Sequence, residues 1–158
     1  MLEQYVHKDL MFLNLDVPDR PALFKQLAEK LEIAGYVTSG FLDFLNHRED
    51  NYPTGLKLDY GAVAIPHGDP QYIVKPFIAV ATLIHPVTMH QMEDADLTVP
   101  VDVFFILGLN SGESHIKMLQ AVIQLIQQEK FVTQIKAAQT PEAAVAAITQ
   151  GVSADEQK

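Results

Sequence analysis

Three short stretches of the chain are apolar at nearly every position, and they restrict the possible folds more than any other feature. They are residues 61–67, 77–84 and 101–109, all rich in alanine, β-branched or aromatic residues. A strand with one face in water alternates apolar and polar residues, whereas a strand covered by helices on both faces is apolar throughout. The three stretches therefore predict central strands of a sheet that has helices on both faces.

Helical patterns precede these strands. Asp19 is a typical helix cap, Pro21 is typical of a first turn, and apolar residues at 3.6 spacing follow as far as Gly35. A second helix is expected to begin at residues 38–39 and to leave through the proline- and glycine-containing segment 46–55. The sequence therefore predicts two helices before the first central strand.

Three further helices are expected after the last strand. The first is expected to have Ser114 as its N-cap, and the second covers residues 131–138. The third begins at residues 140–141 and is expected to end at Gly151, which leaves residues 152–158 as a frayed polar tail. Residues 86–100, between the last two strands, contain many turn-forming residues, and at most a short edge strand is expected there.

This order of elements predicts an α/β fold. The expected architecture is a three-layer sandwich, in which a mixed β-sheet is flanked by helices on both faces. The chain has the length of one ordinary domain, and no repeat or linker divides it. We therefore expect a single domain over residues 1–151, followed by the polar tail 152–158.

Composition excludes several classes of function. Twenty acidic residues against 11 basic ones give a net charge of −9, which argues against nucleic acid as a partner. The chain has no cysteine, so disulfides, thiolate metal sites and a cysteine nucleophile are excluded. The first residues lack a signal-peptide pattern, and no apolar run approaches the ~18 residues of a membrane span. We therefore expect a cytoplasmic protein with no membrane insertion.

The first central strand ends in Pro66 and His67. Proline lacks an N–H and has a fixed φ, so it is expected to end strand pairing and to aim His67 from the edge of the sheet. Ligand sites of α/β sheets gather at strand ends, which makes His67 a candidate functional residue. The alternative is a turn residue whose ring binds a backbone carbonyl.

Two other residues are candidates for binding an anion. With Ser114 as N-cap, His115 lies in a first helical turn, where backbone N–H groups favour a phosphate-sized ligand. Arg48 lies at the end of an upstream helix, and its guanidinium can donate two parallel hydrogen bonds to phosphoryl oxygens. The alternatives are a solvated residue for His115 and, for Arg48, a surface ion pair with Glu49 or Asp50.

Metal and nucleotide sites have little support. His67, Asp69, His85 and His90 supply ligand types without the spacing of a known metal motif, and the acidic residues 93–96 lack the pattern of a calcium loop. Glycine-rich nucleotide motifs are missing from the sequence. No cofactor is therefore expected, although a metal-dependent hydrolase remains an alternative whose test is elemental analysis of the protein.

Four motifs, taken together and in order, resemble one known family. They are "HREDNYPTGL", "GAVAIPHGD", "PVTMHQMEDADLTVPVDVFFILGL" and "SHIKMLQAVIQLI". They resemble the IIA components of the sugar phosphotransferase system (PTS), in the fructose and mannitol class, and the first two are most similar to galactitol-type proteins. The similarity extends over about residues 18–148.

The resemblance implies a function for each candidate residue. His67 corresponds to the phosphoacceptor, His115 to a residue that helps to hold the phosphoryl group, and Arg48 to a position beside the active site. The donor would be the phosphocarrier protein HPr. The acceptor would be a cysteine of a IIB component, which serves a membrane IIC component. Galactitol-type members do not all keep the second histidine, so His115 fits the broader family better than that subgroup.

Two expectations follow from this mechanism. Since protein partners must reach the ring, His67 is expected to be exposed in a shallow depression with an apolar rim, with one ring nitrogen held by a hydrogen bond. Since the chain has no cysteine, the acceptor thiol must lie outside it. The alternative function is a regulatory IIA-like protein, whose phosphorylation state controls a partner.

Overall fold

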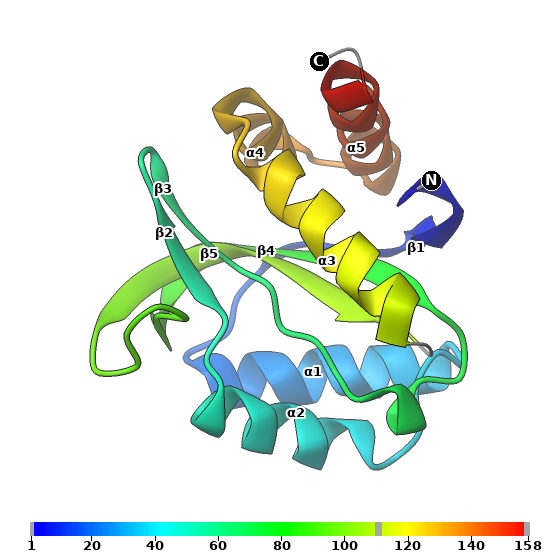
Figure 1. Cartoon of the computed structure of the whole chain (residues 1–158), viewed down its shortest axis with the longest axis vertical. Coiled ribbons are helices and arrows are strands. Elements are labelled where there is room, and N and C mark those ends of the chain that lie inside the picture. The colour runs from blue at the N-terminus through cyan, green and yellow to red at the C-terminus, as the bar shows by residue number, and fades with distance from the viewer. Residues whose placement is uncertain (1, 110–111, 157–158) are drawn as a thin grey trace.

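The structure is a computed structural model that describes residues 2–109 and 112–156, and its sheet lies between two layers of helices. Figure 1 shows α1 and α2 on one face of the sheet and α3, α4 and α5 on the other. In chain order the elements are η1 (Leu2–Tyr5), β1 (Val6–Leu15), α1 (Arg20–Ile33), α2 (Phe41–Asn51), β2 (Gly55–Leu58), β3 (Gly61–Ala64), η2 (Pro70–Tyr72), β4 (Phe77–His90), β5 (Thr98–Gly108), α3 (Gly112–Ile126), α4 (Glu129–Ala137) and α5 (Pro141–Glu156).

The sheet has five strands in the order β1-β4-β5-β3-β2. β1 runs parallel to β4 and β3 parallel to β5, whereas β4 and β5, and likewise β2 and β3, are antiparallel. The three stretches that are apolar throughout supply the three inner strands, β4, β5 and β3, as their composition predicts. The prediction of an α/β fold with a mixed sheet is confirmed.

The first helix agrees with its sequence signals. The Asp19 side chain accepts a hydrogen bond from the Ala22 N–H, and Gly35 has a φ of +86°, a conformation that favours glycine just after a helix. The apolar stripe faces the sheet and is buried at Leu23, Phe24, Leu27, Ala28 and Leu31.

Strands β1 and β2 were not predicted, and the strand content of residues 86–100 was underestimated. β4 continues through Pro86 to His90 and forms a long hairpin with β5, so that only residues 91–97 lie outside the two strands. In this hairpin Val87 lies opposite Val101 and Met89 opposite Val99, and all four are buried. The alternation of these residues with exposed ones is the period-2 signal of a strand, which the turn-forming residues obscured. β1 contains bulges, and Asn14 has a φ of 56°, so its pattern is irregular.

The ends of two helices differ from the prediction. α3 begins at Gly112, so Ser114 lies inside the helix and is not its N-cap. α5 passes through Gly151 and ends at Glu156, and Val152 is buried, so residues 152–156 are not a frayed tail. A Cβ atom on Gly151 would lie 2.7 Å from Leu125 Cδ1. The glycine therefore permits close packing of α5 against α3 and does not stop the helix.

The β2–β3 hairpin is attached to the end of α3. The Tyr60 hydroxyl, in the turn between the two strands, donates a hydrogen bond to the Ile126 carbonyl, and burial raises the pKa of Tyr60 to about 12. This bond fixes the C-terminal end of α3 relative to the strand that leads to His67. Among the described helices, none is long and apolar enough to cross a lipid bilayer.

Candidate functional site

A depression of about 400 Å³ lies where segments far apart in the sequence meet. The contributing segments are the end of α2 and the loop after it, the strand end at His67, the β4–β5 loop and the first half of α3. The lining residues are Arg48, Asn51, Tyr52, Pro53, Thr54, His67, Met92, Ala95 and Leu119. The structure therefore brings Arg48 and His67 to the same cavity, although 18 residues separate them in the chain.

His67 lies in the wall of this depression and is held by the neighbouring strand. The chain keeps its place beside β5 after β3 ends, because the Leu107 N–H donates to the Pro66 carbonyl at 2.9 Å and His67 pairs with Leu107. Only 8% of His67 is exposed, so the expectation of an exposed ring is wrong. Pro66 does not end the strand pairing, and His67 is one of the residues that line the depression. A Cβ atom on Gly68 would lie 2.7 Å from the Phe41 ring, so the glycine allows the chain to turn away directly after His67.

Both ring nitrogens of His67 have neighbours that favour the same tautomer. Nδ1 lies 2.9 Å from the Ile65 carbonyl oxygen, which can only accept, so Nδ1 carries the hydrogen of this bond. Nε2 lies 3.5 Å from Nη2 of Arg48, which can only donate. The expected hydrogen bond to one ring nitrogen is therefore confirmed. The neutral ring presents the Nε2 lone pair on the side of the guanidinium.

Arg48 is half-buried at the end of α2. Its guanidinium lies 5.0 Å from the centre of the Tyr52 ring, and its Nε is buried without a hydrogen-bond partner. The two acids considered as its ion-pair partners are engaged elsewhere: Asp50 pairs with Arg20 at 2.6 Å, and Glu49 binds Thr54. Arg48 is therefore next to His67 rather than in the surface ion pair that was the alternative. Among the described residues that line the depression, it is the only one with a formal positive charge.

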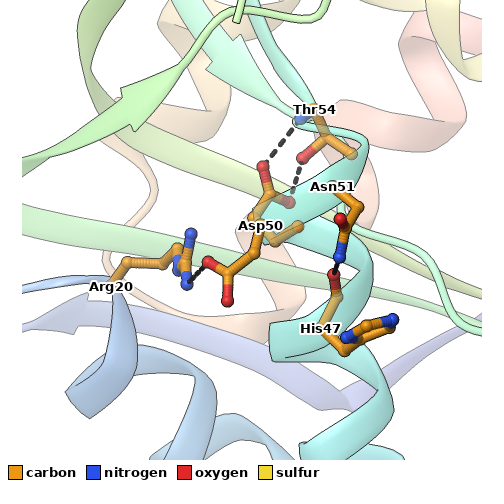
Figure 2. A network of polar contacts seen from close by, with 6 residues as sticks. Arg20, His47, Asp50, Asn51 and Thr54 are labelled. Carbon is orange, nitrogen blue, oxygen red and sulfur yellow. Dashed lines mark hydrogen bonds and ion pairs between the residues drawn. The ribbon is translucent and has the colours of Figure 1, made fainter.

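Glu49 is the next residue of α2 and is 3% exposed. Its carboxylate accepts one hydrogen bond from the Thr54 N–H and one from the Thr54 hydroxyl, each at 2.7 Å. Figure 2 shows both bonds of Thr54 as dashed lines, with the ion pair of Arg20 and Asp50 nearby. Burial raises the pKa of Glu49, and the bonds from Thr54 and the charge of Arg20 only partly oppose this effect.

The raised pKa of Glu49 predicts how stability depends on pH. An acid whose pKa is higher in the folded than in the unfolded chain stabilises the fold most at low pH, and this contribution is lost as pH rises through the folded pKa. A Glu49→Gln variant does not titrate there. We therefore expect the free energy of unfolding of the wild type, relative to Glu49→Gln, to fall as pH rises above about 4.5. Urea unfolding of both proteins between pH 4 and 8 measures this difference, and a difference that is constant or rises with pH would contradict it.

The third candidate, His115, is on the helix that borders the depression. Residue 115 is the fourth residue of α3, one helical turn before Leu119, which lines the depression. The hypothesis that the His115 side chain holds a phosphoryl group lies outside the described residues.

The remaining histidines have other surroundings. His85 is exposed in β4, and the ring of His90 is hydrogen-bonded through Nδ1 to the Ala95 carbonyl at 2.8 Å. In the part of the chain that the structure describes, no group of three or more His, Asp or Glu side chains is arranged to hold a metal ion. The hydrolase site that would combine His67, Asp69 and His85 is not formed by these residues.

Sequence reasoning missed several residues of the site. Asn51 and Thr54 supply polar atoms, and Tyr52, Met92 and Leu119 supply part of the apolar lining. The segment "NYPTG" was interpreted as a loop, and Glu49 was considered only as a surface partner of Arg48. The buried faces of such short segments cannot be found from periodicity, because they depend on contacts between distant parts of the chain.

Comparisons with known proteins give a family match and several similar folds. The family described as "Phosphoenolpyruvate-dependent sugar phosphotransferase system, EIIA 2" matches residues 4–151. An Escherichia coli protein named PTS system 2-O-alpha-mannosyl-D-glycerate-specific EIIABC component is 28% identical over 152 residues, which are 93% of this chain. This chain spans only 22% of the length of that protein.

Two solved structures share the fold. The nitrogen regulatory protein IIA-Ntr from Neisseria meningitidis superimposes with a TM-score of 0.76 at 21% identity, over 92% of this chain and 97% of that one. In the Escherichia coli complex of enzyme IIA mannitol with phosphorylated enzyme IIB mannitol, the matching chain gives 0.72 at 15% identity, over 92% and 97%.

Proposed function

Because this chain belongs to the EIIA type 2 family of the phosphoenolpyruvate-dependent sugar phosphotransferase system, in the mannitol and fructose class, we propose that it carries a phosphoryl group on His67. The donor is phosphorylated HPr and the acceptor is a cysteine of a IIB component, which serves a membrane IIC component in sugar uptake. The observation that supports this most directly is the position of Nε2, which lies beside Arg48 in the wall of an open depression.

The chemistry requires little beyond the neutral ring and a cation. The Nε2 lone pair attacks phosphorus, a new N–P bond forms, and the bond between phosphorus and the donor breaks. No proton has to leave Nε2, because the hydrogen is on Nδ1 and stays in its bond to the Ile65 carbonyl. The Arg48 guanidinium stabilises the negative charge on the oxygens of the transferred group. In the second transfer the acceptor thiolate attacks phosphorus, an S–P bond forms, and the N–P bond breaks, which returns the lone pair to Nε2.

The surroundings of the depression suit protein partners. Tyr52, Met92 and Ile116 are exposed large apolar residues on three of the segments that border it. Apolar residues around a charged centre allow a partner to exclude water while its own reactive residue reaches the ring. Since His67 is mostly buried, the reactive groups of the donor and the acceptor must enter the depression.

The proposal is tested by following phosphate from donor to acceptor. Incubation with phosphoenolpyruvate, enzyme I and HPr is expected to give an acid-labile label on this chain, which a IIB domain then removes. Purified IIB domains of galactitol and of 2-O-α-mannosyl-D-glycerate systems are compared as acceptors, because the sequence motifs favour galactitol or a related sugar. Labelling that does not depend on HPr, or a label that neither IIB domain removes, would contradict the proposed transfer.

A regulatory protein is the second candidate function. It is supported by the similar fold of the nitrogen regulatory protein IIA-Ntr. In this case the phosphate stays on the chain and changes its affinity for another protein, so IIB domains would not remove the label. Both candidate functions place the exchange in the cytoplasm.

His115 is expected to contribute to the rate or stability of phosphorylation. A hydrogen bond to a charged group contributes about 1.5–3 kcal/mol, so His115→Ala is expected to slow phosphorylation about 10- to 100-fold or to shorten the lifetime of the label similarly. Rapid-quench labelling measures the rate, and decay of the isolated phosphoprotein measures the lifetime. His47→Ala, which removes an exposed histidine of α2, is the control. If neither quantity changes, His115 is a solvated helix residue.

A further inference from the structure

A chain of hydrogen bonds connects the buried carboxylate of Glu49 to Nδ1 of the His67 ring. The carboxylate accepts from the N–H and the hydroxyl of Thr54, and the Thr54 carbonyl accepts from the Ile65 N–H at 3.2 Å. The Ile65 carbonyl accepts from Nδ1 of His67 at 2.9 Å. The path thus runs from α2 through Thr54, in the loop after the helix, to Ile65, directly after β3. It ends at Nδ1 of His67, the ring nitrogen that is not beside Arg48.

Burial of the Glu49 carboxylate is energetically unfavourable, and phosphoryl transfer alone does not require a carboxylate at this position. Removing a carboxylate from water is unfavourable unless hydrogen bonds replace the lost solvation, and here two bonds from one residue do so. Glu49 does not line the depression and does not touch Nε2 in any described contact. Its neighbour in the chain is Arg48, so the helix that carries one wall of the site also carries the attachment point of the loop.

The bonds at Thr54 also fix the wall of the site. Pro53 and Thr54 both line the depression, and Thr54 lies between the end of α2 and the start of β2. The Glu49 carboxylate joins this loop to the last turns of α2, which carry Arg48. The loop in turn positions Ile65, whose carbonyl decides which ring nitrogen of His67 holds the hydrogen.

We propose that Glu49 is a positioning residue, which acts through Thr54 and Ile65 to hold His67 in the tautomer with the hydrogen on Nδ1 and to keep Nε2 beside Arg48. This inference rests on the proposed function of His67 as phosphoacceptor. It assigns to Glu49 a function in the geometry of the acceptor rather than in contact with the phosphoryl group.

Two substitutions of Glu49 separate the effect of its hydrogen bonds from the effect of its charge. A glutamine at this position can accept from the Thr54 N–H with its oxygen and donate to the Thr54 hydroxyl oxygen with its amide nitrogen. An alanine can do neither and leaves the Thr54 N–H unpaired in a buried place. Glu49→Gln is therefore the conservative variant that should rescue what Glu49→Ala loses.

The experiment measures the tautomer of His67 and the rate of phosphorylation in the full chain. Nitrogen-15 NMR of the imidazole separates a ring nitrogen that carries hydrogen from one that does not. We expect wild type and Glu49→Gln to show hydrogen on Nδ1 and similar phosphorylation rates with phospho-HPr. Glu49→Ala is expected to show a mixture of tautomers and phosphorylation about 10- to 100-fold slower, the size of effect that a misplaced reacting group produces. Asp43→Ala, which removes an exposed acid from α2, is the control.

Each result decides for or against Glu49. An unchanged tautomer and rate in Glu49→Ala would overturn the proposal, as would a loss in Glu49→Gln equal to that in Glu49→Ala. If circular dichroism shows that Glu49→Ala does not fold, Thr54→Val decides instead, because it removes the hydroxyl donor and keeps the N–H. A partial change in the tautomer then supports the proposal, and an unchanged spectrum overturns it. If wild type takes no phosphate from HPr, the proposed function fails, while the NMR comparison still tests the positioning by Glu49.

Discussion

A His67→Gln variant is expected to take no phosphate from phospho-HPr. The glutamine amide has no lone pair basic enough to attack phosphorus, and the labelling should fall below detection rather than slow down. The fold should persist, because the lost ring bond to the Ile65 carbonyl is one hydrogen bond, worth about 1 kcal/mol. The measurement is the acid-labile label after incubation with phosphoenolpyruvate, enzyme I and HPr, with circular dichroism as the check on folding.

His47→Gln is the matched control for this variant. His47 is an exposed histidine at the end of α2, one residue before Arg48, and only its backbone carbonyl takes part in a described hydrogen bond, from Asn51. Figure 2 shows this bond and the bonds of Thr54 as separate dashed lines. Wild-type labelling is expected in the control. A folded His67→Gln protein that still acquires the label would show that another residue is the acceptor.

Replacement of Arg48 is expected to have the second largest effect. Removing one preorganised donor from a site where charge develops typically slows a reaction about 10²- to 10³-fold, and we expect Arg48→Ala to slow phosphorylation by this amount. Arg48→Lys keeps the charge but loses the planar fork and the stacking on Tyr52, so its rate should lie between those of Arg48→Ala and wild type. Rapid-quench labelling at saturating phospho-HPr measures the rate of the chemical step.

Lys25→Ala is the control for the loss of one positive charge in Arg48→Ala. Lys25 is an exposed residue of α1 outside the depression, so this variant changes the net charge equally and should label at the wild-type rate. The stability cost of Arg48→Ala should be small, since the contact with the Tyr52 ring contributes about 0.5–1 kcal/mol. Labelling of Arg48→Ala at the wild-type rate would remove Arg48 from the mechanism.

Much of the fold could be predicted from local patterns. The three stretches that supply the inner strands are apolar at nearly every position, and α1 carries its cap, its first-turn proline and its terminal glycine in the sequence. Strands whose apolar pattern is irregular or obscured by turn-forming residues could not be predicted in this way. β1 contains bulges and Asn14 has a positive φ, and the second half of β4 contains Pro86 and exposed polar residues that also occur in turns. The sequence also predicts a helix end at Gly151, because the packing of this glycine against Leu125 is a contact between distant segments and leaves no local signal.

Two residues of the site were predictable from the sequence, but most of its lining and its geometry were not. Strand position and the ordered motifs pointed to His67 and Arg48, which line the same depression. The burial of the His67 ring follows from the continued pairing of Pro66 and His67 with β5, and proline is expected to prevent such pairing. Pro66 lacks only the N–H, however, and the Pro66 carbonyl still accepts a hydrogen bond from the Leu107 N–H. The function inferred for Glu49 depends on a loop that closes back on α2, and residue spacing carries no such information.

The most direct test of the account is the position of phosphorus on the imidazole ring. Phosphorus-31 and nitrogen-15 NMR of the ¹⁵N-histidine-labelled phosphoprotein identifies which residue and which ring nitrogen carries the phosphoryl group. The bond of Nδ1 to the Ile65 carbonyl and the position of Arg48 beside Nε2 predict a single phosphohistidine at residue 67, bonded through Nε2, with the hydrogen retained on Nδ1. Phosphorus on Nδ1 of His67, or on any other residue, would contradict it.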